Sequence, residues 1–275
     1  MTASVDAALE AVVRRDRMVV VIALTTVIVL SWAYVLAGAG MGMSAFEMTR
    51  MSQPGMAGGM TGTAMMTPAV WTPGYAVIIF FMWWVMMVAM MLPSAAPMLL
   101  LFVTINRKQR ETGHPHVATS IFAAGYLAAW AGFSLVATML QWEFERTGIL
   151  SPMVVGNNVI FGGVLLLAAG VYQLTPIKHA CLRHCRSPLD FLGTHWHRGA
   201  NGALRMGLTH GAFCVGCCWF LMGLLFFGGV MNVYWIAGLA LFILLEKTLP
   251  AGEWFGYATC VALLVWGVGV LTLSF

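Results

Sequence analysis

A run of soft metal ligands in the second half of the sequence could bind a transition metal. It reads His210-Gly-Ala-Phe-Cys214-Val-Gly-Cys217-Cys218. In a helix, residues three and four apart share a face, so the histidine and the thiols would gather on one side. Thiolate sulfur and imidazole nitrogen are ligands that zinc and copper prefer. A free cysteine can also be a small buried apolar side chain, but three of them beside a histidine favour a metal site.

Six more cysteine and histidine residues precede this run. They are His179, Cys181, His184, Cys185, His195 and His197. Their spacing matches no standard zinc finger, so zinc and a softer metal both stay open. Histidines at a membrane surface can equally be solvated polar residues. Four ligands within seven residues, from His179 to Cys185, favour a ligand cluster.

Methionines crowd the segment 38–73, where Gly, Ser, Thr and Ala separate them. The candidate ligands among them are Met43, Met48, Met51, Met56 and Met60. The thioether is neutral, needs no deprotonation and suits Cu(I). Methionine also fills gaps between packed elements. Both interpretations stay open, although so many methionines in a Gly-rich loop are hard to explain by packing.

A stripe of methionines continues in the apolar run that follows. Its members are Met82, Met86, Met87, Met90 and Met91. Residues 82, 86 and 90 follow i, i+4, i+8 spacing and share one helical face. The stripe could pass a soft ion along the helix, or it could be helix packing, the commoner role of such stripes.

Two prolines, Pro93 and Pro97, follow the stripe. Each removes a backbone donor and frees the carbonyl four residues earlier. In lipid such carbonyls must face protein, water or an ion. We therefore expect a kinked helix with this turn buried in the bundle.

Glu246 and Lys247 end a later apolar run. A carboxylate at membrane depth is a candidate functional group. The alternative is that Glu246 simply pairs with a nearby base at the helix end.

The composition requires a membrane environment for these residues. Apolar residues make up 60% of the 275 residues, only 9% are charged, and the mean hydropathy is +0.86. Soluble domains are about a quarter charged, so a soluble enzyme and a disordered chain are excluded. Long unbroken apolar runs favour helices over a membrane barrel. The expected fold is an all-α polytopic helical membrane bundle.

Seven apolar runs are long enough to cross the hydrocarbon core of a bilayer. They are 18–36, 75–102, 117–140, 156–174, 207–228, 231–249 and 254–273. We expect one membrane domain over 1–275. It would comprise a first span within 1–37, a Met- and Gly-rich outer loop at 38–73 and a six-span metal-binding core at 74–275.

The basic residues orient this bundle. With seven spans, all lysines and arginines except Arg50 and Arg146 fall on one side. Basic loops mark the cytoplasmic side, so the N-terminus is expected there, in a bacterial cytoplasmic membrane. Cytoplasmic thiols stay reduced, which favours metal binding over disulfides. The net charge of +4 then comes from the basic loops that set the topology. Membrane lipid, and not nucleic acid, is therefore the expected partner.

Four motifs resemble a bacterial family of predicted metal-binding integral membrane proteins, a domain of unknown function. They are 86–98 (MMVAMMLPSAAPM), 184–189 (HCRSPL), 210–211 (HG) together with 214–219 (CVGCCW), and 246–247 (EK). The resemblance covers the second to seventh spans. It implies a membrane-embedded metal site and says nothing of the Met-rich loop.

The leading hypothesis is a membrane protein that binds a soft metal, copper before zinc, in uptake, transfer or delivery. Outer methionines would capture Cu(I), the stripe would pass it inward, and His210 with the thiols would bind it. One alternative is an accessory subunit of a larger membrane oxidoreductase, such as a copper-dependent monooxygenase, which would have protein partners. Another is a thiol redox protein. No catalytic residues are assigned.

Overall fold

The computed structural model describes all residues except 1, 52–69, 112–117, 151–158, 251 and 273–275. The described residues form helices and no strand, which confirms the all-α prediction. The helices are α1 (Thr2–Leu36), α2 (Ala45–Met51), α3 (Pro73–Glu111), α4 (Thr119–Arg146), α5 (Val159–Gln173), α6 (Pro176–Arg186), α7 (Pro188–Thr194), α8 (Gly199–Gly223), α9 (Leu225–Gly228), α10 (Val233–Thr248) and α11 (Gly252–Thr272).

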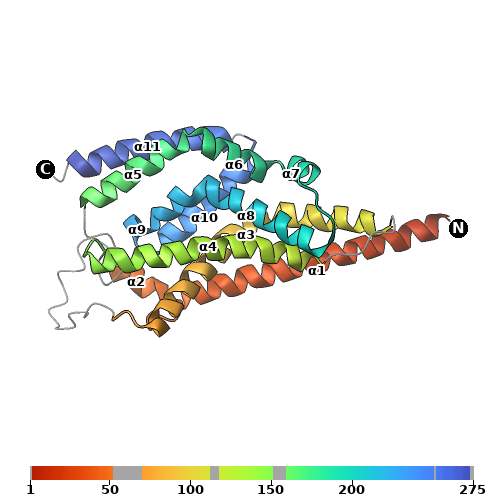
Figure 1. Cartoon of the computed structure of the whole chain (residues 1–275), viewed down its shortest axis with the longest axis horizontal. Coiled ribbons are helices and arrows are strands. Elements are labelled where there is room, and N and C mark those ends of the chain that lie inside the picture. The colour runs from red at the N-terminus through yellow and green to blue at the C-terminus, as the bar shows by residue number, and fades with distance from the viewer. Residues whose placement is uncertain (1, 52–69, 112–117, 151–158, 251, 273–275) are drawn as a thin grey trace.

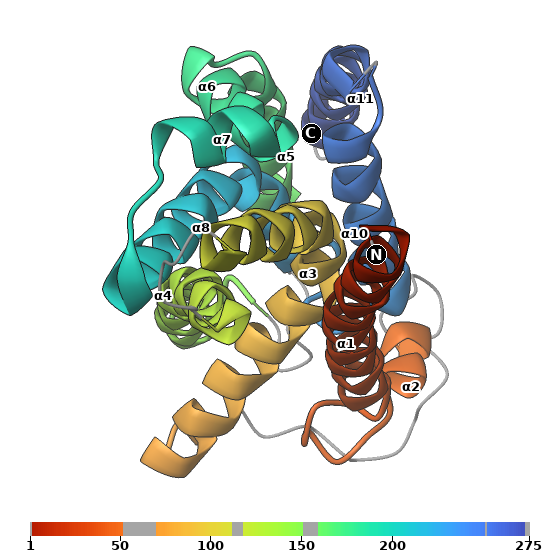
Figure 2. The same ribbon diagram turned by 90° about the vertical axis from the view of Figure 1, so that its right-hand side faces the viewer.

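The long helices run side by side along the longest axis of the molecule (Figure 1). Helix α4 packs on α8, α5 on α11 and α1 on α3. In the end view, α5 and α11 lie together on the upper side, and α4 and α1 lie below them on opposite sides of α3 (Figure 2). Helices α6 and α7 lie toward one end of the bundle, and α2 lies toward the other (Figure 1). The short helices therefore mark the two ends.

Five helices among the described residues are long and apolar enough to cross a membrane. A sixth candidate is α5 together with α6, which meet at a bend of 64°. The predicted count of seven is not confirmed, because α10 has only 16 residues and a full crossing needs about 20. The Asn232 side chain accepts the Tyr234 amide and begins α10, and Pro250 follows its end. Local capping thus keeps this helix short.

The bend between α5 and α6 also has a local cause. The Thr175 side chain accepts a hydrogen bond from the Lys178 amide, and Pro176 takes the first position of α6. Both features begin a new helix rather than continue the old one. The bend turns α6 toward α8, where Cys185 of α6 becomes part of the site.

Glycines hold α8 against α4 at van der Waals distance. A Cβ atom added to Gly207 would lie 2.0 Å from the carbonyl oxygen of Phe122, and one added to Gly125 would lie 2.2 Å from that of Leu204. Gly211 faces Ala129 in the same way. Small residues of this kind let membrane helices pack backbone to backbone. We call these three glycines the glycine seam.

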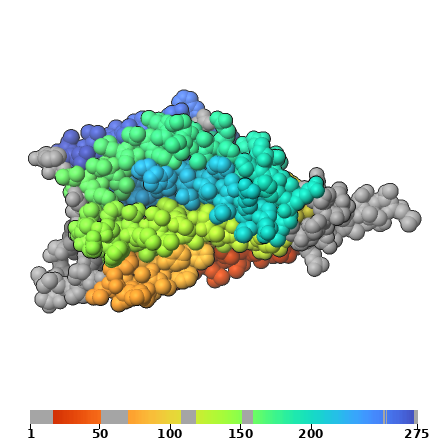
Figure 3. Space-filling view, in the orientation of Figure 1, coloured from red at the N-terminus to blue at the C-terminus, as the bar shows by residue number. Residues whose placement is uncertain are grey.

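The outward surface is rich in large apolar side chains. Val19, Leu30, Val261 and Val265 are all exposed, and Trp254 is 77% exposed. Figure 3 shows α4, α8 and α5 side by side on one broad face of the bundle. Exposed apolar surface on this scale has a stable environment in lipid. The long apolar helices and this surface agree with a multi-pass membrane protein.

Candidate metal centre

Four cysteine side chains meet in the interior of the bundle. Helix α8 contributes Cys214, Cys217 and Cys218, all at most 1% exposed, and α6 contributes the buried Cys185. The Cys185 thiol lies beside those of Cys214 and Cys217, close enough for both pairs to interact. Cys218 interacts with the same two α8 thiols. We call these four residues the thiol centre.

Two thiols of the centre donate to the helix backbone. Cys217 and Cys218 both donate to the carbonyl oxygen of Cys214, at 3.1 and 3.0 Å. All six cysteines are free thiols. Within the part of the chain that the structure describes, no three Cys, His, Asp or Glu side chains are arranged to hold a metal ion. An ion would therefore need sulfur side chains to rotate toward one another between their staggered rotamers.

Two polar groups from other helices contact the Cys214 sulfur. The Lys247 ammonium nitrogen donates to it at 2.9 Å and lies 3.4 Å from the Ser94 hydroxyl. The Tyr126 hydroxyl lies 3.2 Å from the same sulfur and 3.2 Å from the Met91 carbonyl oxygen. Helices α3, α4 and α10 thus all reach the thiol centre.

The methionine stripe ends at the thiol centre. The thioether sulfur of Met91 lies 4.0 Å from the Cys218 sulfur. The other stripe residues, Met82, Met86, Met87 and Met90, are at most 1% exposed and belong to the hydrophobic core. Two sulfur-bearing segments that are far apart in the sequence are therefore neighbours in space.

His210 lies one helical turn before Cys214 and is buried. Its ring stacks on Tyr126 with centroids 5.7 Å apart and meets Phe191 edge to face at 5.3 Å. Its Nδ1 atom is buried and has no hydrogen-bond partner among the described residues. Leaving a buried polar atom unpaired costs about 1–3 kcal/mol. This nitrogen is therefore available to a ligand or an ion.

The six residues of the first ligand group do not form one cluster. Cys185 joins the thiol centre, and the Cys181 sulfur lies against Gly216 of α8. His179 faces Tyr257 of α11. Successive helical residues are turned by about 100°, so α6 distributes neighbouring ligands over different faces.

The remaining histidines of that group lie at the end of the bundle. The rings of His184 and His195 are 5.9 Å apart between centroids. His197 is exposed, and its backbone amide donates to the Met206 sulfur at 3.4 Å. In the structure, Cys185 therefore belongs to the thiol centre, and His184 and His195 are neighbours. The other three residues of the group, His179, Cys181 and His197, lie apart from both.

The Met-rich loop is only partly described. Met43 and Met48 are half-buried. Met56, Met60 and the Met51 side chain lie outside the described residues. Ser44 and Glu47, which lie between Met43 and Met48, form a capping box that begins α2. The Ser44 amide donates to the Glu47 carboxylate at 2.8 Å, and the Glu47 amide donates to the Ser44 hydroxyl at 3.3 Å. The Ser44 amide and the Ser44 hydroxyl, which each donate to the Glu47 carboxylate at 2.8 Å, hold the pKa of Glu47 below its ordinary value.

Helix α3 continues through both prolines and changes direction along its length (Figure 2). The expectation that the whole proline turn is buried is wrong for Pro97, which is exposed, whereas Pro93 is half-buried. The two prolines are four residues apart and share a face, while Met91, Ala95 and Met98 occupy the buried face. The Met91 carbonyl accepts the Ser94 hydroxyl at 2.9 Å as well as that of Tyr126.

Glu246 and Lys247 point to different partners. Glu246 forms a buried salt bridge with Lys178 of α6, and the Gln173 amide oxygen accepts a second hydrogen bond from the same ammonium. The base that pairs with Glu246 is thus on another helix. Lys247, the next residue, reaches the thiol centre instead. This salt bridge fixes α6, and with it Cys185, against α10.

Three residues at the site were not expected from the sequence: Tyr126, Ser94 and Lys178. Tyr126 lies in an apolar run without candidate ligands around it, and Ser94 follows the methionine stripe but is not itself a soft ligand. The buried Lys178 carried the only usable signal, because a charged residue beside an apolar run is a candidate for pairing inside the membrane.

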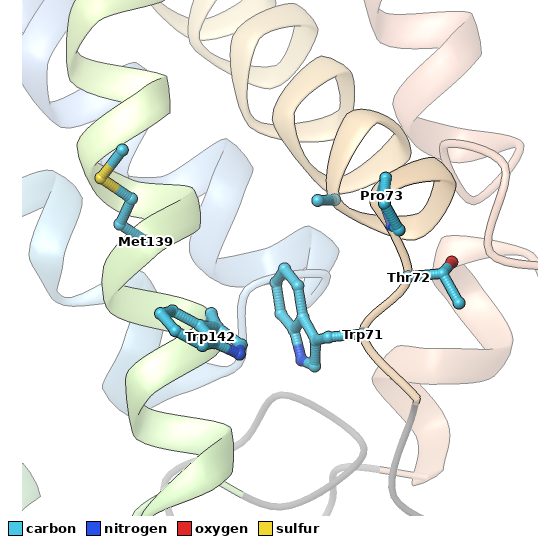
Figure 4. A pocket seen from close by; sticks show the side chains of 6 residues that line it. Trp71, Thr72, Pro73, Met139 and Trp142 are labelled. Carbon is cyan, nitrogen blue, oxygen red and sulfur yellow. The ribbon is translucent and has the colours of Figure 1, made fainter.

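A separate cavity of about 300 Å³ lies between the beginning of α3 and α4 (Figure 4). It is lined by Trp71, Thr72, Pro73, Ala76, Met139 and Trp142. The Trp71 indole donates to the Glu145 carboxylate at 2.8 Å. At 1.5 Å per residue, the start of α3 is about 27 Å along the helix from Met91. This apolar cavity, with a single thioether, is not part of the thiol centre.

The fold and the site together define a multi-span helical membrane protein with a buried cluster of soft sulfur ligands. Residues 80–270 match the PpoB2 family, which is described as a copper chaperone. This region is well over half of the chain, so the chain belongs to that family. The family description indicates a function related to copper. The region includes the thiol centre and the methionine stripe but not the Met-rich loop. No curated protein and no solved structure matches the chain.

Proposed function

We propose that the protein binds Cu(I) at the thiol centre and passes it to an acceptor. The observation that carries this proposal is the meeting of Cys185 from α6 with Cys214 and Cys217 from α8. Two helices that converge on three sulfurs provide the soft, low-coordinate environment that Cu(I) prefers. Copper is the cargo here, and its transfer is an exchange of ligands without a redox step.

The methionine stripe supports transfer rather than storage. Neutral thioethers from Met82 to Met91 line the core and end 4.0 Å from a thiol of the centre. An ion moving along them would exchange weaker thioether ligands for stronger thiolate ligands. With the N-terminus in the cytoplasm of a bacterial cell, this gradient runs inward, from the Met-rich loop to the cysteines. The family description favours this role over an oxidoreductase subunit or a thiol redox protein.

The test is copper loading of the purified full-length chain in detergent under a thiol-free reductant. Wild type should retain Cu(I) after desalting, and the triple variant Cys185→Ser, Cys214→Ser, Cys217→Ser should retain much less. The matched control is Cys260→Ser on α11, another buried cysteine, which should load like wild type. Equal copper in the triple variant would refute the thiol centre. Preferential retention of Zn²⁺ in competition would identify zinc as the ion instead.

A further inference from the structure

His184 and His195 come together at the end of the bundle where α6 and α7 lie. Their ring centroids are 5.9 Å apart, and the ring planes are at 79°. Two imidazoles that share one ion have centroids about 6 Å apart, given metal–nitrogen bonds of about 2 Å. Both side chains are half-buried, so solvent and a partner can reach them. We call these two residues the histidine pair.

One nitrogen of each ring is already committed as a donor. His184 Nδ1 lies 2.8 Å from the Ala180 carbonyl oxygen, which can only accept, so Nδ1 carries the hydrogen. His195 Nδ1 lies 2.8 Å from the Thr194 hydroxyl oxygen. That hydroxyl gives its own hydrogen to the Asp190 carbonyl oxygen at 2.7 Å. It must therefore accept from His195, and Nδ1 is the donor there as well.

In the neutral form of each ring, these hydrogen bonds leave the lone pair of Nε2 available. No hydrogen bond to either Nε2 atom is present among the described residues. A backbone carbonyl or hydroxyl that holds one ring nitrogen while the other binds metal is the usual arrangement around metal-ligating histidines. The pair thus has the tautomer that a metal site requires.

Aromatic stacking fixes both rings. His184 lies parallel to Phe213 at 4.2 Å, with planes at 10°. His195 lies parallel to Phe191 at 4.9 Å, with planes at 12°. Because neither ring can turn without losing this contact, the two Nε2 atoms keep their positions.

The same phenylalanines connect the pair to the thiol centre. Phe213 directly precedes Cys214, and His184 directly precedes Cys185. Phe191 also contacts the ring of His210 at 5.3 Å, one turn from Cys214. The pair therefore lies next to the centre, on its solvent-facing side.

We infer that the histidine pair is a second copper site, which binds Cu(I) through both Nε2 atoms and exchanges it between the thiol centre and an external acceptor. Two protein ligands leave a coordination position open, and an acceptor can enter there before the ion leaves. Imidazole binds copper and is a weaker site than a thiolate cluster. The inference rests on the proposed function, because the pair would be the point at which Cu(I) enters or leaves the thiol centre.

The experiment uses the full-length chain with His184→Phe and His195→Phe together, because phenylalanine keeps the stacked ring and removes the nitrogens. Each protein is loaded with Cu(I), and transfer to the chelator bathocuproine disulfonate is followed by absorbance. X-ray absorption at the copper edge gives the nitrogen and sulfur ligands at one and two equivalents of copper. The matched control is His179→Phe with His197→Phe, which lie apart from the pair.

We expect the pair variant to keep its sulfur-bound copper, to lose nitrogen ligation at the second equivalent, and to transfer copper at least about tenfold more slowly. The control should resemble wild type. Unchanged transfer with nitrogen ligation retained would overturn the inference. A failure of the thiol centre would appear separately, as copper retained by the triple cysteine variant. The two failures are therefore distinguishable.

Discussion

The ammonium nitrogen of Lys247 lies 2.9 Å from the sulfur of Cys214, although 33 positions separate them in the sequence. Lys247 is 7% exposed and Cys214 is 1% exposed. A buried ammonium is costly unless it has a partner, and this sulfur is one of its two partners. The thiol centre consequently depends on the docking of α10, a helix that contributes no sulfur to it.

The Lys178–Glu246 salt bridge gives the first prediction. Glu246→Gln should lower the free energy of unfolding by about 3–5 kcal/mol, because it leaves the Lys178 ammonium buried without its counter-charge. Thermal or denaturant unfolding of the purified protein in one detergent measures this. The double variant Lys178→Met, Glu246→Leu should recover most of the loss, since no charge remains buried. A single variant as stable as wild type would contradict the assigned pairing.

Tyr126→Phe removes a hydroxyl that lies 3.2 Å from both the Cys214 sulfur and the Met91 carbonyl oxygen. The expected loss of stability is about 1 kcal/mol, the net value of one hydrogen bond. The affinity for Cu(I) should fall by about tenfold, because a group that orients a metal ligand is lost. Competition with a Cu(I) chelator measures the affinity. The control is Tyr257→Phe on the exposed side of α11, for which affinity should not change.

The glycine seam predicts a severe effect from one methyl group. Gly207→Ala would place Cβ 2.0 Å from the Phe122 carbonyl oxygen, and backbone cannot move aside as a side chain can. Overpacking of this kind costs about 1–3 kcal/mol or more. The yield of monodisperse protein after size-exclusion chromatography should drop sharply. Gly132→Ala on α4, where nothing lies within 4 Å of the added atom, should express like wild type.

The capping box of α2 predicts a pH dependence at one end of the bundle. The Ser44 amide and then the Ser44 hydroxyl lower the pKa of Glu47 in the folded state. A lowered pKa stabilises the fold above the ordinary glutamate pKa, and that contribution is lost as the pH falls through the lowered value. The protection of the Ser44 amide against hydrogen exchange, relative to the intrinsic exchange rate at each pH, should therefore fall in acid. In Glu47→Gln, which can still accept the bond but does not titrate, this fall in protection should be absent.

Much of the fold follows from composition and apolar run length. The helical membrane class and the approximate ranges of most spans need only those two properties. The number of spans in the structure differs from the predicted seven because helix capping at Asn232 shortens α10 and helix capping at Thr175 bends the chain between α5 and α6. Such caps set where a helix starts, and hydropathy does not register them.

The candidate site was only partly predictable. The α8 ligands share a face because they lie on one helix, and i, i+4 spacing shows this directly. The participation of Cys185 depends on the 64° bend, a tertiary feature. Sequence proximity suggested that Cys185 belongs with His179, but the helical period sends them in different directions. Tyr126 joins the site from α4, and no local pattern marks it.

The glycine seam divides the bundle into parts that can and cannot move. Backbone-to-backbone contact makes α4 and α8 one rigid body, since sliding or rotation would drive Gly207 into Phe122. Helix α6 touches that body through side chains, which can repack. Hence a shear of α6, which would have to break its salt bridge to Glu246 of α10, would separate Cys185 from Cys214 and Cys217 while those two stay together. The coordination number available to a bound ion would fall from three to two in that motion, which couples helix displacement to metal affinity.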